Sequence, residues 1–453
     1  MGDLAHGRDG SLPGLLAGFD CQLPRWLTVR NIFLLLLLIS LAVDLGFGFA
    51  YKFRLSPDQL DADELEYYKM AGQMMGGTLH LTARRTLGFP LLIASVRSIS
   101  DNFLFLQAVI CALFSFSAPL LFLVVRKVTR STAAAGVSGL ALALWPPVIF
   151  YGVSLYSEAL ALPVFLLALW ALPVGSRAGS AVKGFHWRQA AAAGVLLAIA
   201  TQVRPMYLIM TPFIAIIIAI EEADLRVAFR RLLVVAFAYV AVTLPWSIYM
   251  TERFHHPILI TSNGGETLSG GLNPKLLEPW AERRKLVGGR EVWVGPGKWL
   301  TPHQNGYLTR AELALPYDQQ DALMRERTMD WVKANPGAAV QLESCKFLYM
   351  WGLYHISKNG PGQLVFGNLP TLALLAIALF GFIRVPEART ALARFWVLPF
   401  FVSAVALISW GSWRFRQPGD AGLVVFCSVC VLVYLAKRRV AHDVAERELA
   451  LSA

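Results

Sequence analysis

The chain has few charged residues for its length. Asp, Glu, Lys and Arg make up 16% of its 453 residues, and 56% are hydrophobic, whereas an ordinary soluble domain carries about 25% charged residues. A soluble fold cannot bury that much apolar surface, but a lipid bilayer can. The apolar runs approach or exceed the roughly 20 residues that a helix needs to cross the hydrocarbon, and they are too uniform for alternating barrel strands. The composition therefore predicts an all-α polytopic membrane protein.

Several motifs that would indicate a soluble enzyme are also missing. The sequence contains no P-loop, no Ser-His-Asp spacing and no H-E-x-x-H motif. Its five cysteines are scattered, and the Cys427-x-x-Cys430 pair lies in an apolar run, which favours packing over metal or redox chemistry. We expect no nucleotide cofactor and assign no metal ligand, with a divalent cation left as an open alternative. We expect no cleavable signal peptide either, because residues 1–30 are polar and the first apolar run is typical of a true span.

The apolar runs predict about ten transmembrane helices. They lie near 31–50, 103–125, 132–151, 156–174, 189–203, 206–220, 231–250, 366–384, 395–411 and 419–436. If the N-terminus is cytoplasmic, every short loop on that side is basic, as the positive-inside rule requires. Examples are Arg126, Lys127 and Arg130 in one loop and Lys437, Arg438 and Arg439 after the last span. These loops and anionic lipid account for the net charge of +11 better than nucleic acid does.

This topology divides the chain into five parts. Residues 1–30 and 437–453 are cytoplasmic tails, and residues 31–250 hold spans one to seven with a first outer loop at 51–102. Residues 251–365 form a second outer loop, and residues 366–436 hold spans eight to ten. Both outer loops contain amphipathic or short apolar stretches that are expected to lie as helices along the membrane interface.

The first outer loop carries four carboxylates within six positions, at Asp61, Asp63, Glu64 and Glu66. Crowded acids perturb one another's pKa, so one of them is a candidate general base. The alternative is a helix start, with Asp61 as the N-cap and Asp63 and Glu64 favoured by the helix dipole. Further along, Arg84 and Arg85 are suited to bind phosphate oxygens, or else to anchor the loop at lipid head groups.

Other polar residues are expected near the same membrane face. Glu158 opens the fourth span, where an acid is functional more often than at a soluble surface, and Arg204 joins spans five and six. Gly-rich turns in the second outer loop could cradle a sugar or phosphate through backbone amides, or could simply be flexible. The candidates in that loop are Asn263, Gly264, Gly265 and Asn273. Lys346 precedes span eight, and Arg414 and Arg416 lie outside, against the charge rule, between spans nine and ten.

In their order these features resemble the GT-C class of membrane glycosyltransferases. The nearest resemblance is to the bacterial protein O-mannosyltransferase-like group and the lipid A aminoarabinose transferase, over about residues 30–436. The family's Asp-Glu pair four residues before a Tyr matches Asp63-Glu64 with Tyr67. Its Arg and Pro-Gly-Tyr-Pro-like segment matches Arg85 and Gly88-Phe89-Pro90, although Leu87 replaces the first Pro and Phe89 the Tyr. Its late Arg-x-Arg-x-Pro matches 414–418.

The resemblance implies an inverting transfer of a sugar from a polyprenyl-phosphate donor to an acceptor hydroxyl at the outer, periplasmic face of the bacterial inner membrane. Asp63 would be the base, with Glu64 and Glu158 beside it. The donor phosphate would be held by Arg85, Lys346 and Arg416, with Arg84, Arg204 and Arg414 as weaker candidates. The implied partners are an undecaprenyl-phosphate-type donor, membrane lipid and a glycolipid, glycan or protein acceptor. The alternatives are a flippase for lipid-linked saccharides and a glycan ligase or polymerase.

Overall fold

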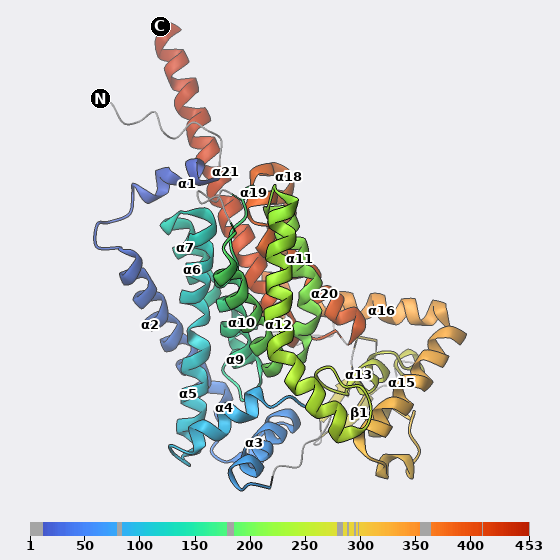
Figure 1. Cartoon of the computed structure of the whole chain (residues 1–453). Helices are drawn as coiled ribbons and strands as arrows, with labels where there is room; N and C mark the ends of the chain where they lie inside the picture. Colours follow the sequence, from blue (N-terminus) through green and yellow to red (C-terminus); the bar gives the residue numbers. More distant parts are fainter. Residues whose placement is uncertain are drawn as a thin grey trace.

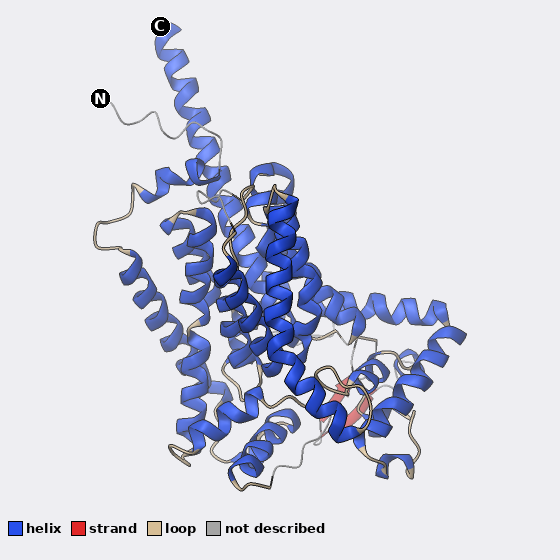
Figure 2. Ribbon diagram, in the orientation of Figure 1, coloured by secondary structure: helices blue, strands red, loops and turns tan. Residues whose placement is uncertain are grey.

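The computed structural model describes residues 12–78, 84–178, 185–278, 284–287, 290–293, 296–297, 299–353, 364–409 and 411–452. In these ranges the chain is almost entirely helical, as Figure 2 shows. The strands among the described residues are β1 (Arg284–Val287) and β2 (Arg290–Trp293), which pair antiparallel with Arg284 opposite Trp293. The expected helical fold is therefore confirmed, apart from this hairpin, which the sequence did not predict.

Most helices form one bundle (Figure 1) around a single large apolar core. The bundle contains α1 (Leu12–Asp20), α2 (Val29–Phe47), η1 (Gly48–Lys52), α5 (Phe103–Ser115), α6 (Ser117–Thr129), α7 (Thr132–Ala143), α8 (Pro146–Gly152), α9 (Glu158–Ala171), α10 (Trp187–Val203), η3 (Pro205–Ile209), α11 (Met210–Glu221), α12 (Leu225–Phe254), η8 (Leu364–Asn368), α18 (Leu369–Arg384), α19 (Pro386–Ala391), α20 (Ala393–Ile408), η9 (Trp413–Arg416) and α21 (Gln417–Ser452). Small residues allow close contacts within it. A Cβ on Gly194 of α10 would lie 2.3 Å from the Val235 carbonyl oxygen of α12.

The structure does not confirm the count of ten spans. Four described helical segments are long and apolar enough to cross a membrane, namely Val29–Lys52, Phe103–Thr129, Leu225–Phe254 and Trp413–Ala450. The pair α7 and α8, bent by 59°, could add a fifth. The other expected spans coincide with shorter helices. For example, the 14 residues of α9 rise only about 21 Å at 1.5 Å per residue, less than the ~30 Å hydrocarbon.

The remaining helices gather at one end of the bundle, which we call the loop end. These are η2 (Pro57–Gln59), α3 (Ala62–Met75), α4 (Gly88–Arg97), α13 (Gly264–Gly271), η4 (Pro274–Leu277), α14 (Pro302–Asn305), η6 (Glu312–Ala314), α15 (Tyr317–Ala334) and α16 (Pro336–Met350). Helix α1 and the C-terminal part of α21 lie at the opposite end, which we call the termini end (Figure 1). The described parts of the two predicted outer loops therefore share one end of the molecule, and their location outside the membrane stays a prediction.

A buried ion pair fixes α9 at the termini end. The guanidinium of Arg394 binds both carboxylate oxygens of Glu221, at 2.9 and 2.5 Å. It also donates to the carbonyl oxygens of Leu169, Leu172 and Pro173, where α9 ends. Carbonyls at a helix C-terminus lack intrahelical donors, so a cation there satisfies them and complements the helix dipole. The opposite end of α9 is Glu158, at the loop end, so this pair helps to set the position of that carboxylate.

Candidate active site

The N-terminus of α3 places two neighbouring carboxylates in different surroundings. Glu64 accepts a hydrogen bond from the backbone amide of Asp61 in a capping box, and its other oxygen accepts one from the amide of Leu155, both at 3.1 Å. Burial raises the pKa of Glu64. Asp61 is thus the N-cap of α3, as the helix-start interpretation predicts. Glu64 also ties α3 to the turn before α9, which was not predicted. Its proposed catalytic role is not tested by these contacts, which are all with backbone.

Asp63 faces two arginines instead. Its Oδ1 lies 2.5 Å from Nη2 of Arg85 and its Oδ2 lies 2.5 Å from Nη1 of Arg414. Burial by itself would raise the pKa of Asp63, but the charges of Arg85 and Arg414 and their hydrogen bonds outweigh it and hold that pKa well below its usual range. The side chain keeps 31% of its surface exposed, so it is not sealed inside the bundle.

Arg414 connects Asp63 with the second predicted acid. Its Nε and Nη2 both bind the Glu158 carboxylate, the latter at 3.2 Å. Glu158 is buried and also lies 2.5 Å from Nη1 of Arg204. The Arg414 guanidinium stacks 4.0 Å above the Tyr156 ring, and the Tyr156 hydroxyl donates to Asp61 at 2.8 Å. Three predicted site arginines and two predicted acids thus form one continuous cluster at the loop end.

A second set of ion pairs joins the two outer segments. Glu66 Oε2 lies 2.9 Å from Arg84 Nη1 and 2.8 Å from Arg85 Nη2. Arg84 also donates from Nε and Nη2 to the two oxygens of Glu266 in α13, at 2.9 and 2.8 Å. The Tyr317 hydroxyl at the start of α15 hydrogen-bonds the same carboxylate. Arg84 therefore connects the segment before α4 to the second outer segment rather than standing alone on the surface.

Two predicted phosphate ligands lie outside this cluster. Lys346 is fully buried, and its Nζ lies 2.8 Å from Glu343 and 3.1 Å from the carbonyl oxygens of Leu407 and Ser409. Arg416 is also fully buried, 2.7 Å from Asp420. It donates in addition to Met350 and Thr371. Both cations already have protein partners, so their contacts suit holding α16, α20 and α21 together, and a phosphate role for them stays a prediction.

The Gly-rich segment of the second outer loop is partly accessible. Asn263 is half-buried and Gly264 is exposed, with open space where a Cβ would lie. Gly265 is packed tightly, since a Cβ would lie 1.9 Å from the Asp321 carbonyl oxygen. Asn273 is fully buried and bonds the Asn305 carbonyl and the Lys275 amide. Only Asn263 and Gly264 of the four are thus placed to meet a ligand directly.

Three residues of the cluster were not predicted from the sequence as site residues, namely Glu66, Glu266 and Tyr156. Glu66 lay in the acidic run, so its signal was present but shared with three neighbours. Glu266 gave no signal, because its partner Arg84 is 182 positions away. Tyr156 stood next to Glu158 in a stretch that was interpreted through the acid alone.

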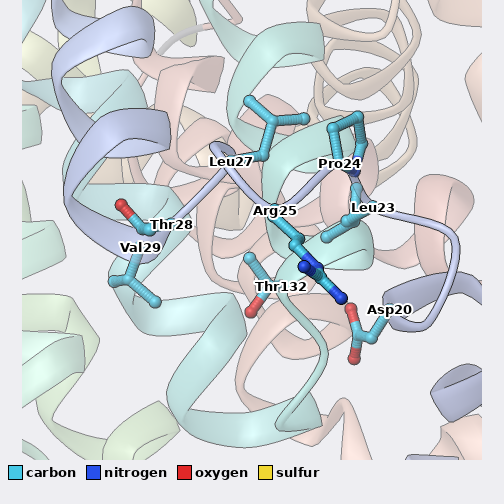
Figure 3. A pocket seen from close by; sticks show the side chains of 8 residues that line it. All are labelled: Asp20, Leu23, Pro24, Arg25, Leu27, Thr28, Val29 and Thr132. Atoms are coloured by element: carbon cyan, nitrogen blue, oxygen red, sulfur yellow. The ribbon is translucent and has the colours of Figure 1, made fainter.

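A pocket at the termini end is separate from this cluster. Figure 3 shows its lining side chains, with that of Arg25 directed toward Asp20. They are Asp20, Leu23, Pro24, Arg25, Leu27, Thr28, Val29 and Thr132. Among the described residues, the group with metal-ligand proximity is His442, Asp443 and Glu446, exposed on the last turns of α21. Neither feature touches the carboxylate–arginine cluster.

Comparisons with known proteins support the fold class. No family model and no curated protein matches the sequence. The structure is similar to that of the archaeal oligosaccharyltransferase AglB from Archaeoglobus fulgidus in complex with an inhibitory peptide and a dolichol-phosphate, with a TM-score of 0.50 and 13% identity over 93% of this chain and 52% of that chain. Two further oligosaccharyltransferase structures from A. fulgidus are also similar. The apo form has a TM-score of 0.46 and 13% identity over 92% of this chain and 52% of that chain. The complex with Zn and sulfate has a TM-score of 0.48 and 14% identity over 93% of this chain and 51% of that chain.

The likeness to the AglB complex is one of fold, because the identity is low. It supports the helical, GT-C-like fold that the sequence resembles, while membership of the bacterial group named from the sequence stays a prediction. The chain spans about half the length of these solved proteins, 52% in the case of the AglB complex.

Proposed function

We propose that this chain is a glycosyltransferase that moves a sugar from a polyprenyl-phosphate donor to an acceptor hydroxyl with inversion. The observation that carries the proposal is the bridge from Asp63 through Arg414 to Glu158, with Arg85 and Arg204 at its two ends. It combines an accessible carboxylate with several fixed cations at one end of an apolar bundle. A transfer from a lipid phosphate needs both, because a base activates the acceptor while cations stabilise the negative charge that develops on the leaving phosphate.

The partly exposed arginines are the first candidates for the donor phosphate. Arg85 and Arg414 contact Asp63 directly, and Arg84 is 30% exposed beside them. Guanidinium groups bind phosphate oxygens through two parallel N–H donors, which suits this position. The other three candidates are buried, namely Arg204, Lys346 and Arg416. They would act indirectly, by positioning the residues that they contact.

The orientation in the membrane belongs to the same proposal. We place the loop end outside the cytoplasm and both chain ends inside it, in the bacterial inner membrane, with an undecaprenyl-phosphate-type carrier. The basic short loops support that orientation. AglB, whose fold is similar, is described in complex with a dolichol-phosphate and an inhibitory peptide. That description supports a lipid-linked donor here and an acceptor that is a glycolipid, a glycan or a protein.

Transfer of a whole glycan is the second candidate function, because the fold is shared with an oligosaccharyltransferase. A flippase is supported less. The pair Arg394–Glu221 is buried at the termini end, and a transport path through the bundle would have to open there.

The test is transfer by the full chain in membranes supplied with a radiolabelled polyprenyl-phosphate sugar. Wild-type protein should release polyprenyl phosphate and form a labelled product, whose mass distinguishes one sugar from a whole glycan. Asp63→Asn should lose nearly all transfer, and Asp58→Asn, at an exposed position of η2, should keep it. Equal turnover of both variants would remove Asp63 from the mechanism. Movement of the labelled lipid between leaflets without a new glycosidic bond would support the flippase instead.

A further inference from the structure

We infer that Arg414 acts as a substrate-responsive guard of Asp63. It binds the carboxylate in the resting protein and leaves it for the donor phosphate, so that Asp63 becomes a base only once the donor is bound. This inference rests on the proposed function and concerns the regulation of the same site. It starts from a conflict in the resting geometry, where the carboxylate that should accept a proton is bound by two cations.

The two cations make resting Asp63 a poor base. General base catalysis is most effective when the base has a pKa near the working pH. The pKa of Asp63 is instead held well below its usual range by Arg85 and Arg414, against the effect of burial. Removing one of the two would return proton affinity to the carboxylate at the moment when the acceptor hydroxyl must be deprotonated.

Arg414 is the cation that can leave. It makes two contacts to buried Glu158 and only one to Asp63, from Nη1. Rotation about the Glu158 contacts would release Asp63 without breaking the buried pair. The Tyr156 ring would keep the guanidinium over its face during such a change. The face of the ring attracts the cation, but it does not fix the direction of the guanidinium hydrogen bonds. Arg85 is less free, because its Nη2, the atom that contacts Asp63, also contacts Glu66, so leaving Asp63 would disturb that pair as well.

Other charges around Asp63 favour the same exchange. Glu66 on α3 faces Arg85, and Glu158 on α9 faces Arg414 and Arg204. Arg84 lies on the far side of Glu66. On the neighbouring elements, Lys52 and Asp61 lie close enough to Glu64 to act on its charge. The donor phosphodiester carries one negative charge, so its entry between Arg84 and Arg414 would give Arg414 a phosphate partner in place of a carboxylate. The leaving phosphate gains a second negative charge as its bond to the sugar breaks.

Sugar transfer then exchanges one bond at the anomeric carbon for another. The acceptor oxygen forms a bond to the anomeric carbon, and its proton passes to the freed Asp63 carboxylate. The bond between the anomeric carbon and the phosphate oxygen breaks, and its electron pair stays on the phosphate. Arg414, already moved onto that phosphate, stabilises the added negative charge. One arginine thus couples donor binding to activation of the base.

The experiment measures protonation of Asp63 directly. Purified full-length protein in detergent is treated with a water-soluble carbodiimide, which modifies protonated carboxyl groups, and labelling of Asp63 is followed by peptide mass spectrometry. The probe is farnesyl phosphate, and farnesol, which lacks the phosphate, is the control. An opposite charge within ~4–6 Å lowers a carboxyl pKa by about 1–3. In wild-type protein, farnesyl phosphate should draw Arg414 away from Asp63 and so raise the Asp63 labelling rate at pH 5 by about 10- to 1,000-fold. Farnesol should leave that rate unchanged.

An internal reference and one variant complete the design. Glu312, whose pKa the hydrogen bonds from Arg327 and Thr309 hold at about 2, lies in η6 and should label at the same rate throughout. In Arg414→Ala, Asp63 should be labelled rapidly without any ligand. Farnesyl phosphate should not raise that labelling rate further, even at concentrations at which native mass spectrometry shows the variant to be fully occupied by it.

Two results would overturn the inference. One is an Asp63 labelling rate in wild-type protein that farnesyl phosphate does not change. The other is an equal rise in Arg414→Ala, which would mean that the phosphate acts on Asp63 by its own field. Neither result bears on whether Asp63→Asn abolishes transfer, so the guard and the proposed function can fail separately.

Discussion

Nη1 of Arg414 lies 2.5 Å from Oδ2 of Asp63, although 351 positions of sequence separate the two residues. The contact joins the first outer segment to the short η9 turn before the last long helix. It brings together a carboxylate and a cation that were predicted, from distant segments of the sequence, to belong to one site. Asp63 therefore meets a positive charge before any substrate arrives.

Asp63→Asn and Asp63→Ala should both reduce transfer by about 10²–10⁴-fold, the usual contribution of a positioned general base. The amide cannot accept the acceptor proton, and it also lacks the charge that orients Arg85 and Arg414. The measurement is turnover of a polyprenyl-phosphate sugar in membranes that contain equal amounts of each protein. Asp58→Asn is the matched control, since Asp58 belongs to the same outer segment and lies outside the cluster. A reduction below tenfold in both Asp63 variants would contradict the prediction.

The pKa of Asp63 predicts how acid affects stability. Its folded-state pKa lies below its usual range, so the folded protein binds fewer protons at this group than the unfolded chain. The stabilisation is therefore complete above the ordinary Asp pKa of about 3.9 and is lost as the pH falls below it. Thermal unfolding should be insensitive to this group between pH 6 and 8. Asp63→Asn should show a shallower fall in Tm below pH 5 than wild type, and parallel curves would contradict the assignment.

The contact of Arg84 with Glu266 should hold the two outer segments together. Breaking a buried ion pair costs about 3–5 kcal/mol. Because Arg84 is 30% exposed, we expect Glu266→Ala to cost less than that but more than the ~0.2–1 kcal/mol of a fully exposed pair. Limited proteolysis should cleave the second outer segment of this variant faster than that of wild type. Arg327→Ala, which removes a more exposed pair with Glu312, should have a smaller effect, and equal cleavage of the two variants would argue against a special role for Arg84.

Two adjacent glycines offer a matched test of packing between α13 and α15. In Gly265→Ala the new methyl would lie 1.9 Å from the Asp321 carbonyl oxygen, whereas Gly264→Ala would meet open space. Overpacking of this kind costs typically about 1–3 kcal/mol. Gly265→Ala should therefore lower the Tm clearly, and Gly264→Ala should change it little. Similar Tm values for the two variants would show that this part of α13 is packed differently.

At the termini end, Glu221→Ala should destabilise the bundle by about 3–5 kcal/mol, because it leaves the guanidinium of Arg394 buried without its carboxylate. The double variant Glu221→Leu with Arg394→Met should recover much of that loss, since replacing a buried pair by apolar side chains is often neutral. Thermal unfolding in detergent measures both effects. A surface comparison is Glu387→Ala, whose partner Lys437 is partly exposed. A double variant as unstable as Glu221→Ala would mean that the pair does not act as one unit.

Much of the helical structure followed from composition and local pattern. The apolar runs predicted most helix positions, because the hydrophobicity of a segment that enters lipid depends on its own residues. The acidic run before Tyr67 predicted the start of α3, because capping is a local interaction. Local pattern could not settle how many helices cross the membrane, since several apolar segments form helices shorter than a bilayer requires.

The site was predictable only in part. The sequence by itself determined which ionisable residues are available, and it predicted that Asp63, Glu158, Arg85 and Arg414 lie together on one outer face. Which arginine meets which acid was decided by tertiary structure, because pairs such as Arg84 with Glu266 and Arg414 with Glu158 are 182 and 256 positions apart. The fold also decided that Lys346 and Arg416 are buried with partners of their own. Local sequence determines helix propensity and side-chain charge. Distances between remote side chains depend instead on how the helices pack, and that packing cannot be predicted from a short sequence pattern.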